Sequence, residues 1–257
     1  MEVAMDEVAE RGCSFLVAGR VDDSGLVPLR TASGGRLATV PVGWMARAFL
    51  WAFNVRLECP NRDKIQAHEG MIICNHLSYA DVAAVLAVTP VRFLSTAGVR
   101  RIPIIGWLAI AIETIFVNRN KQESRKKARH EIAQKLNKQI SPPVLIFPEG
   151  GTGPGTWLLP FRHGAFAIAM ESGVSILPCA LVYEPLSAFH YFQRNDTLLK
   201  AVWRLAMQPS VKRIILEPLT PLDSVDYDDP ERFAHEAEQI LAGSLGLEIG
   251  IDRERFV

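Results

Sequence analysis

The sequence has few cysteines, no long hydrophobic run and no excess of charge of either sign. Its four cysteines form no Cys-x-x-Cys pair, which is unlike a disulfide scaffold and predicts a reducing, cytoplasmic environment. No stretch of 18 uncharged apolar residues is found, so no conventional transmembrane helix is predicted, and residues 1–11 lack the apolar run of a signal peptide. The formal net charge is zero, which excludes a general electrostatic preference for nucleic acid.

The composition is that of a folded globular protein. Hydrophobic residues make up 49% of the 257 residues and charged residues 22%, which fits one α/β domain with a large core. Turn signals without periodic pattern fill the first 40 residues. We therefore expect a peripheral extension over 1–40, a folded domain over 41–246 and a C-terminal tail over 247–257.

After residue 40, short β-type runs alternate with helical patterns. This alternation predicts an α/β fold with a largely parallel sheet flanked by helices. The predicted strands are Met71–Cys74, Val91–Leu94, Thr114–Val117, Val144–Phe147, Val174–Val182 and Arg213–Leu216. The predicted helices cover residues 43–56, 79–88, 104–112, 122–139, 163–172, 197–206 and 230–243.

The first predicted helix, over residues 43–56, is apolar and aromatic. It is too short to span a bilayer, but its aromatic side chains are typical of a helix lying at a membrane interface. The alternative is that these aromatics belong to the core. The side chains concerned are Trp44, Phe49, Trp51 and Phe53.

Polar residues that could take part in catalysis or binding follow three of the predicted strands. His76 comes after Met71–Cys74, Arg119 after Thr114–Val117, and Glu149 after Val144–Phe147. Because ligands of open parallel sheets bind beyond the carboxyl ends of the strands, we expect these side chains to share one crevice.

His76 is the candidate general base. A neutral histidine can take a proton from an alcohol while the alcohol oxygen attacks an acyl carbonyl, and a carboxylate on the other ring nitrogen supports it. Asp81, five residues later, can supply that carboxylate if the chain folds back. The alternative is structural, because Ser78 and Asp81 also have the spacing of a capping box that begins a helix.

Two further segments can be interpreted in two ways. The glycine-rich stretch from Glu149 to Gly155 can bring successive amides to an anion or oxyanion, or it is an ordinary turn. Arg119 suits a phosphate or carboxylate, or pairs with a nearby acid on the surface. No Gly-Lys-Ser/Thr follows the glycines, which excludes a nucleotide phosphate loop.

Taken together, these segments resemble the glycerolipid acyltransferase family, which includes 1-acylglycerol-3-phosphate acyltransferases. Four blocks stand in the family's order and at suitable spacing over residues 40–220. They are residues 75–81 (NHLSYAD), 114–119 (TIFVNR), 147–150 (FPEG) with 159–166 (LPFRHGAF), and 176–181 (ILPCAL).

The resemblance implies roles for particular residues. His76 would be the base and Asp81 would orient it, while the substrate-binding residues would be Asn75, Arg119, Glu149, Gly150 and Pro178. Acyl-CoA or acyl carrier protein would be the donor, with no metal, no other cofactor and no covalent acyl-enzyme. We expect the enzyme on the cytoplasmic face of a membrane, in phospholipid biosynthesis, with a lysophospholipid as acceptor and 1-acylglycerol-3-phosphate as the first candidate.

The third block departs from the family pattern. Gly151-Thr152-Gly153 stands where the family usually has Thr-Arg-Ser, so the basic residue credited with holding an acceptor phosphate is missing. A lysolipid with a larger or zwitterionic head group is therefore an alternative acceptor. Two different functions also fit these residues: a thioesterase or hydrolase on the same scaffold, and a lipid-binding module without activity.

Overall fold

The computed structural model describes residues 36–96, 114–117, 122–189, 198–208 and 210–250. The predicted helix over 104–112 and the candidate site residue Arg119 lie outside this range. The helices are α1 (Arg36–Ala52), α2 (Arg62–Ala67), α3 (Ala80–Val88), α5 (Gln122–Lys138), α6 (Gly164–Ser172), α7 (Leu186–Phe189), α8 (Leu198–Ala206) and α9 (Pro230–Leu245), with a 3₁₀ turn, η2, at Ser224–Asp226.

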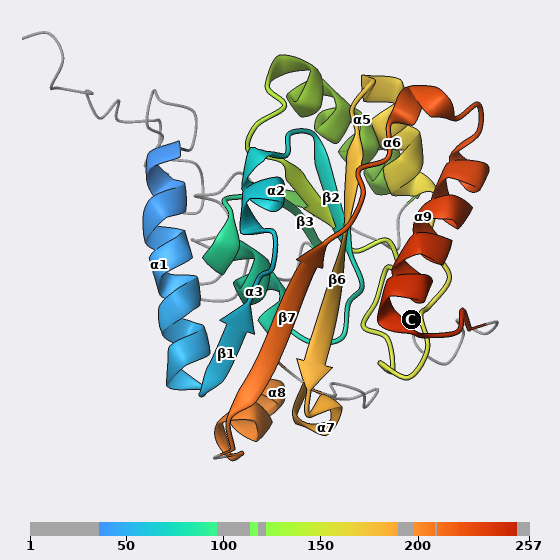
Figure 1. The fold of residues 1–257 in the computed structure, drawn as a ribbon. Coiled ribbons are helices and arrows are strands. Elements are labelled where there is room, and N and C mark those ends of the chain that lie inside the picture. The colour runs from blue at the N-terminus through green and yellow to red at the C-terminus, as the bar shows by residue number, and fades with distance from the viewer. Residues whose placement is uncertain (1–35, 97–113, 118–121, 190–197, 209, 251–257) are drawn as a thin grey trace, which may run out of the picture.

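The strands of the described residues form one sheet, with helices on both faces (Figure 1). They are β1 (Val55–Glu58), β2 (Met71–Cys74), β3 (Arg92–Thr96), β4 (Ile115–Val117), β5 (Val144–Ile146), β6 (Ile176–Glu184) and β7 (Lys212–Pro218). Their order in the sheet is β1-β7-β6-β2-β5-β3-β4. Every neighbouring pair is parallel except β6 and β7, so the prediction of a largely parallel sheet flanked by helices is confirmed.

Alternate residues of the central strands face two separate cores. Ile72 and Cys74 of β2 point into the core that α1 and α3 cover, whereas Met71 and Ile73 point into the core under α5, α6 and α9. All four side chains are buried, as expected for a parallel strand covered on both faces. The sequence run MIIC is therefore uniformly apolar rather than alternating.

The helix ends follow local capping chemistry. Asp229 accepts hydrogen bonds from the amides of Glu231 and Arg232 and so caps α9, with Pro230 at the first helical position. Gly246 ends the same helix in the left-handed conformation, at φ 64°. These signals explain why the predicted helix over 230–243 lies within two residues of the observed one.

The N-terminal part of the fold differs from the prediction. α1 ends at Ala52, and the predicted continuation to residue 56 is wrong, because Asn54 turns the chain with φ 54° and Val55 opens strand β1. α1 also begins at Arg36, inside the predicted extension over 1–40.

At the C-terminal end, Ile249 forms a bridge with Leu158, so part of the predicted tail over 247–257 pairs with the domain.

None of the helices in the described ranges combines the length and the apolar character needed to cross a bilayer. The aromatic residues of α1 and its end divide into two groups. Phe49 and Phe53 pack against the core, with ring centroids 4.6 Å apart, whereas Trp44 and Trp51 are 67% and 83% exposed. The core alternative thus holds for the two phenylalanines, and the tryptophans form an exposed face.

Candidate active site

His76 lies in the loop after β2 and contacts Asp81 in the first turn of α3. The distance between His76 Nδ1 and Asp81 Oδ2 is 2.8 Å. Since an ionised carboxylate only accepts hydrogen bonds, Nδ1 carries the hydrogen and Nε2 is the nitrogen that can take a proton. Within the described residues, no hydrogen bond to Nε2 is found, and the side chain is 17% exposed.

Asp81 is fully buried, and its Oδ2 atom also organises the loop. It accepts hydrogen bonds from the amides of Leu77 at 2.8 Å and Ser78 at 2.9 Å. The bond from the Ser78 amide is the reach-back contact of a capping box. The same oxygen atom thus makes the contact with His76 and the two contacts that hold the loop.

The ring of His76 is fixed on its flat side as well. It stacks on Phe147 with centroids 4.1 Å apart and an interplanar angle of 17°. Burial, and then the negative charge of Asp81, raise the pKa of the buried Tyr183 well above its usual value. A neutral Tyr183 beside Asp81 adds no competing charge to the site.

Asn75 and Glu149 hold the loop rather than pointing into open space. The Asn75 side chain donates to the Leu181 carbonyl at 2.9 Å and accepts from the Leu181 amide at 2.8 Å, which ties the end of β2 to β6. Glu149 is 2% exposed and accepts from the amides of His76 at 2.6 Å and Leu159 at 3.1 Å. Both residues fix the main chain on either side of the imidazole.

Two of the remaining predicted site residues lie in different parts of the fold, Gly150 in a loop and Pro178 in the sheet. Gly150 directly follows Glu149, with φ 77°, a conformation that favours glycine. Pro178 lies inside β6, paired in register with Ile73, so it belongs to the sheet rather than to the loops beyond it. The structure thus brings His76, Asp81, Glu149 and Gly150 together at the carboxyl ends of β2 and β5.

The thiol nearest to His76 along the chain is not suited to be a nucleophile. Cys74, two residues before His76, is fully buried, and burial together with the neighbouring Cys179 thiol raises its pKa well above its usual value. A thiol must lose its proton to attack a thioester, so its environment opposes covalent acyl transfer through Cys74. Direct attack by an acceptor activated by His76 needs no such intermediate.

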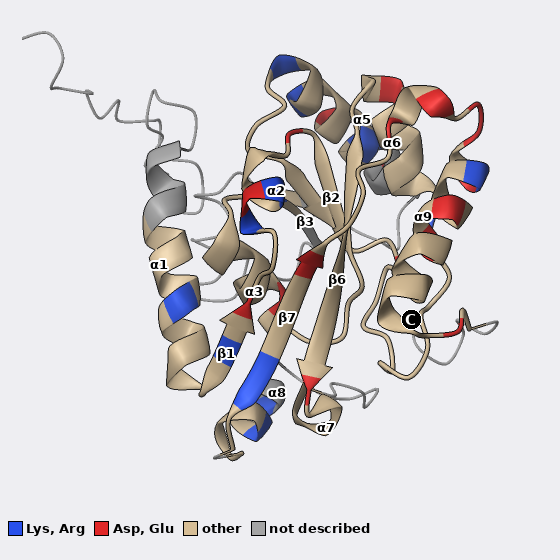
Figure 2. Cartoon of the chain, viewed as in Figure 1, with Lys and Arg blue, Asp and Glu red and all other residues tan. Residues whose placement is uncertain are grey.

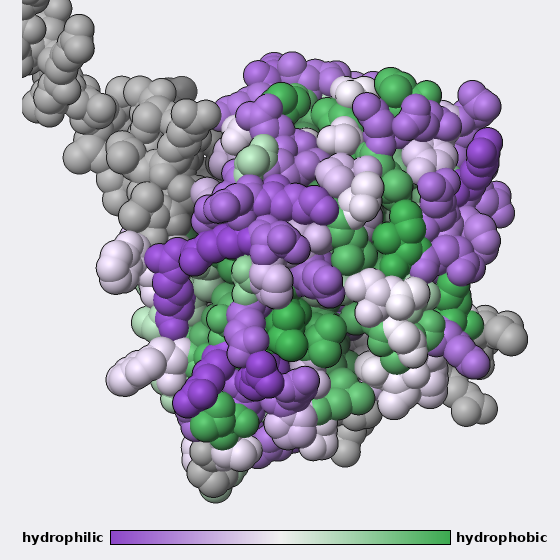
Figure 3. All heavy atoms as spheres, viewed as in Figure 1, coloured by the Kyte–Doolittle hydropathy of each residue, from purple (hydrophilic) through white to green (hydrophobic). Residues whose placement is uncertain are grey.

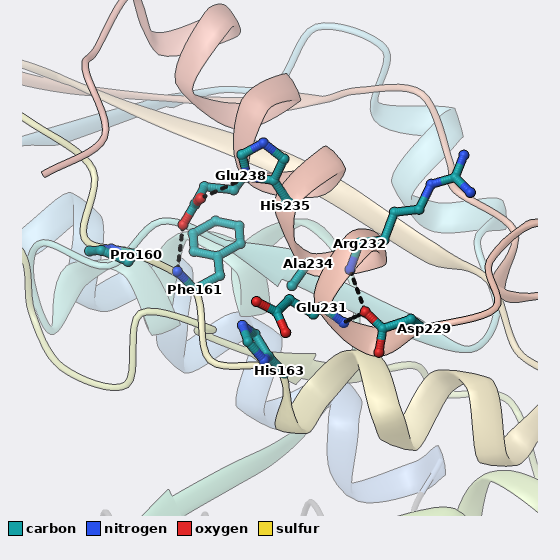
Figure 4. A pocket seen from close by; sticks show the side chains of 9 residues that line it. All are labelled: Pro160, Phe161, His163, Asp229, Glu231, Arg232, Ala234, His235 and Glu238. Atoms are coloured by element: carbon teal, nitrogen blue, oxygen red, sulfur yellow. Dashed lines mark hydrogen bonds and ion pairs between the residues drawn. The ribbon is translucent and has the colours of Figure 1, made fainter. Parts of the chain in front are cut away.

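A surface pocket of about 470 Å³ lies elsewhere, between α9 and the segment before α6 (Figure 4). Its lining residues are Pro160, Phe161, His163, Asp229, Glu231, Arg232, Ala234, His235 and Glu238. Several of its polar groups already have structural partners: Asp229 caps α9, and Glu238 accepts from the Phe161 amide at 2.6 Å. Neither His76 nor Asp81 lines it, so the pocket lies apart from the candidate active site.

No cluster of three or more His, Cys, Asp or Glu side chains that could hold a metal ion is found in the described part of the chain. An imidazole oriented by a carboxylate, beside a glycine-rich loop, is suited to remove a proton from a hydroxyl.

Comparison with known proteins agrees with this geometry. The profile of the acyltransferase family matches residues 56–182, which include His76, Asp81 and Glu149. The lyso-ornithine lipid O-acyltransferase of Pseudomonas aeruginosa is 33% identical over 77% of this chain and 76% of that protein. The chain belongs to the acyltransferase family.

Other relatives share the family but less of their length. The 1-acyl-sn-glycerol-3-phosphate acyltransferase of Neisseria meningitidis is 28% identical over 54% of each chain. The human 1-acyl-sn-glycerol-3-phosphate acyltransferase beta is 28% identical over 58% of this chain and 54% of that protein. This acyltransferase therefore spans little more than half of their length.

A solved structure has the same fold. The 1-acyl-sn-glycerophosphate acyltransferase PlsC of Thermotoga maritima superposes with a TM-score of 0.64, covering 82% of this chain and 80% of that one, at 19% identity. The resemblance stated from the four sequence blocks is thus confirmed, and the protein is an acyltransferase.

Proposed function

We propose that this acyltransferase moves a fatty acyl chain from acyl-CoA or acyl carrier protein to the hydroxyl of a lysolipid, with His76 as general base. The observation that carries the proposal is the 2.8 Å contact between His76 Nδ1 and Asp81 Oδ2. Nε2 takes the proton of the acceptor hydroxyl as its oxygen forms a bond to the thioester carbonyl. The carbon–sulfur bond then breaks, and the leaving thiolate takes the proton from the imidazolium.

Two acceptor head groups are supported by separate observations. A phosphate monoester, as in 1-acylglycerol-3-phosphate, is supported by the names of the Neisseria and human relatives. A zwitterionic head group is supported by the Pseudomonas lyso-ornithine lipid relative and by the neutral Thr152 at the position where the family blocks usually carry arginine. Both acceptors belong in the first assay.

The acceptor lives in a bilayer, so we place the enzyme on a membrane surface, on the cytoplasmic side where thioester donors are available. Support comes from exposed apolar side chains on two helices. α1 presents Trp44, Met45 and Trp51, and α8 with the segment after it presents Trp203, Met207 and Val211. Figure 3 shows hydrophobic residues reaching the surface in the lower half of the view, around β6 and β7, where Figure 1 places α8.

The proposal is tested by thiol release from acyl-CoA by the detergent-solubilised enzyme, with each lysolipid and without acceptor. We expect acceptor-dependent release that His76→Ala lowers by about 10²- to 10⁴-fold. His235→Ala is the matched control, because His235 is exposed on α9 and lies outside the site. The assay is then repeated with the acyl chain carried by acyl carrier protein in place of CoA.

Other results would change the assignment. Release without acceptor that is lost in His76→Ala would make the protein a thioesterase, with water in place of the acceptor. No release with either donor and any lysolipid, with lipid binding retained, would favour a lipid-binding module. Equal activity of His76→Ala and wild type would remove His76 from the mechanism.

A further inference from the structure

Arg162 is held beside the glycine-rich loop by its own main chain. Its amide donates to the Pro148 carbonyl at 2.9 Å, and the preceding amide, of Phe161, donates to Glu238 at 2.6 Å. These bonds fix the segment before α6 against the segment that carries Glu149 and Gly150. The position of Arg162 therefore follows from the fold and not from a chance surface contact.

The Arg162 side chain lies over Gly150. A Cβ atom built on Gly150 would lie 3.0 Å from Arg162 Cζ and closer still to Nε, so the guanidinium occupies the space that a side chain would need. Gly150 also has φ 77°, which favours glycine for a second reason. The glycine thus lets a cation approach the loop.

The glycine-rich loop under Arg162 makes hydrogen bonds to both main-chain polar groups of His76, the proposed base. Glu149, one residue before Gly150, accepts the His76 amide at 2.6 Å, and the Gly153 amide donates to the His76 carbonyl at 2.6 Å. A group that binds between Arg162 and this loop is thus next to the segment that carries the base.

The surroundings of Arg162 leave its charge available to a ligand. The residue is exposed, and in the part of the chain that the structure describes no ion pair to it is found. The nearest acid along the loop, Glu149, is buried and uses both oxygens on main-chain amides. Gly151 and Thr152 are half-exposed and neutral, and their amides have no hydrogen bond within the described residues.

We propose that Arg162, with the amides of Gly151 and Thr152, binds the anionic group of the acceptor head group, a function that rests on the proposed lysolipid acceptor. A guanidinium and two adjacent amides match the oxygens of a phosphate monoester or a carboxylate. Arg162 thereby supplies from the segment before α6 the positive charge that Thr152 does not supply within the loop. It determines acceptor specificity and takes no part in proton transfer.

The test compares acceptors of different charge with one acyl donor, in detergent. Arg162→Gln is expected to raise the KM for lysophosphatidic acid or lyso-ornithine lipid roughly 10- to 100-fold. The KM for the donor and the turnover of uncharged monoacylglycerol are expected to change less than about twofold. Arg129→Gln on α5, which removes an exposed arginine elsewhere, should leave all of these unchanged.

A second variant tests the position of the charge. Adding Thr152→Arg to Arg162→Gln is expected to recover preference for an anionic acceptor, because it returns a guanidinium to the same loop. If the acceptor affected is lysophosphatidic acid, the bound anion is a phosphate. If it is lyso-ornithine lipid, the bound anion is a carboxylate. An equal loss with charged and uncharged acceptors, or no loss with either, would overturn the proposal.

A binding measurement separates this proposal from the proposed function. Calorimetric titration uses glycerol 3-phosphate and N-acetylornithine as probes of the phosphate and carboxylate head groups. Binding of either probe that weakens at least tenfold in Arg162→Gln supports the anion site even if no acyl transfer is found. Equal binding of both probes by wild type and Arg162→Gln, or no binding by wild type, refutes the site even if acyl transfer is confirmed.

Discussion

Asp81 is a single buried residue on which both the loop conformation and the proposed chemistry depend. Its Oδ2 atom accepts from the His76 ring and from the amides of Leu77 and Ser78. The two amide bonds hold the loop in the form that presents the imidazole, and the third bond fixes the tautomer. A change at Asp81 therefore affects orientation and stability together.

Asp81→Asn should separate these effects. The amide keeps an oxygen acceptor but has no charge to stabilise the imidazolium, so we expect kcat to fall by about 10²- to 10⁴-fold. The free energy of unfolding should fall by about 1–3 kcal/mol, because hydrogen bonds to a buried charged group weaken. Steady-state kinetics and urea unfolding measure the two. A kcat within about threefold of wild type would show that Asp81 only caps α3.

At this scale the sequence predicts local pairs well and distant ones poorly. The five-residue spacing of His76 and Asp81 allows their contact if the chain folds back at the start of a helix, and the structure has that loop and helix start. Asn75 bonds the main chain of Leu181, 106 residues away, and Glu149 accepts from the His76 amide, 73 residues away, as well as from the nearer Leu159 amide. No pattern within either segment indicates that their side chains bond to the backbone, and substrate binding is what the family resemblance implies for both.

The short helix α2 is joined to β2 by one histidine. His68, at the C-terminal cap of α2, has Nε2 2.8 Å from the Met71 carbonyl. The ring must donate to that carbonyl, and it can do so while neutral. Burial lowers the pKa of His68 below its ordinary value of 6.5, because the charged form is poorly solvated there.

This shift predicts how stability depends on pH. The folded state binds fewer protons at His68 than the unfolded state, so the contribution of His68 to stability falls as the pH drops through about 6.5. His68→Gln keeps a donor but does not titrate. Urea unfolding at pH 7.5, 6.5 and 5.5 should show the wild type losing stability relative to the variant. Two parallel pH profiles would contradict the prediction.

At the scale of helices and strands, prediction fails where one element runs into the next with only a short polar interruption. The apolar pattern continues from α1 through Phe53 into Leu57, so it predicts a longer helix in place of the start of β1. The turn depends on Asn54 with its positive φ and on Lys212, whose Nζ donates to the Phe53 carbonyl at 2.9 Å. That lysine is 159 residues from Phe53, beyond the reach of a local pattern.

Across the whole molecule, α8 and the C-terminal end of α1 lie at the edge of the sheet that carries His76. β7 starts beside the end of β6, with Arg213 opposite Glu184, so α8, which precedes β7, lies at the carboxyl edge of β6. Lys212 Nζ also donates to the Gln208 carbonyl at 2.6 Å, and so ties the end of α8 to the end of α1.

Charge does not add to this orientation. Lys212 at the start of β7 is buried, and Arg213 pairs with Glu58 and Glu184. Figure 2 shows Lys and Arg on α8 but also on α5, toward the end where Asp and Glu gather around the N-terminal half of α9. With α8 and the end of α1 on the bilayer, the proposed orientation brings the loop with His76 toward the lipid surface.

This orientation predicts which exposed apolar residues matter for membrane binding. The double variant Trp51→Ala, Trp203→Ala removes one exposed tryptophan from α1 and one from α8, and its binding to anionic vesicles in flotation should fall about tenfold or more. Val225→Ala is the control, since Val225 is 75% exposed but belongs to η2, which follows the opposite end of β7.

Activity in detergent micelles should be the same for all three proteins, because none of these side chains belongs to the site. Equal flotation of the double variant and wild type would place the membrane contact elsewhere. Loss of flotation in Val225→Ala alone would reverse the orientation and turn His76 away from the bilayer. If the wild-type enzyme does not float with vesicles, it takes its acceptor from micelles or from a carrier, and the proposed membrane contact is wrong.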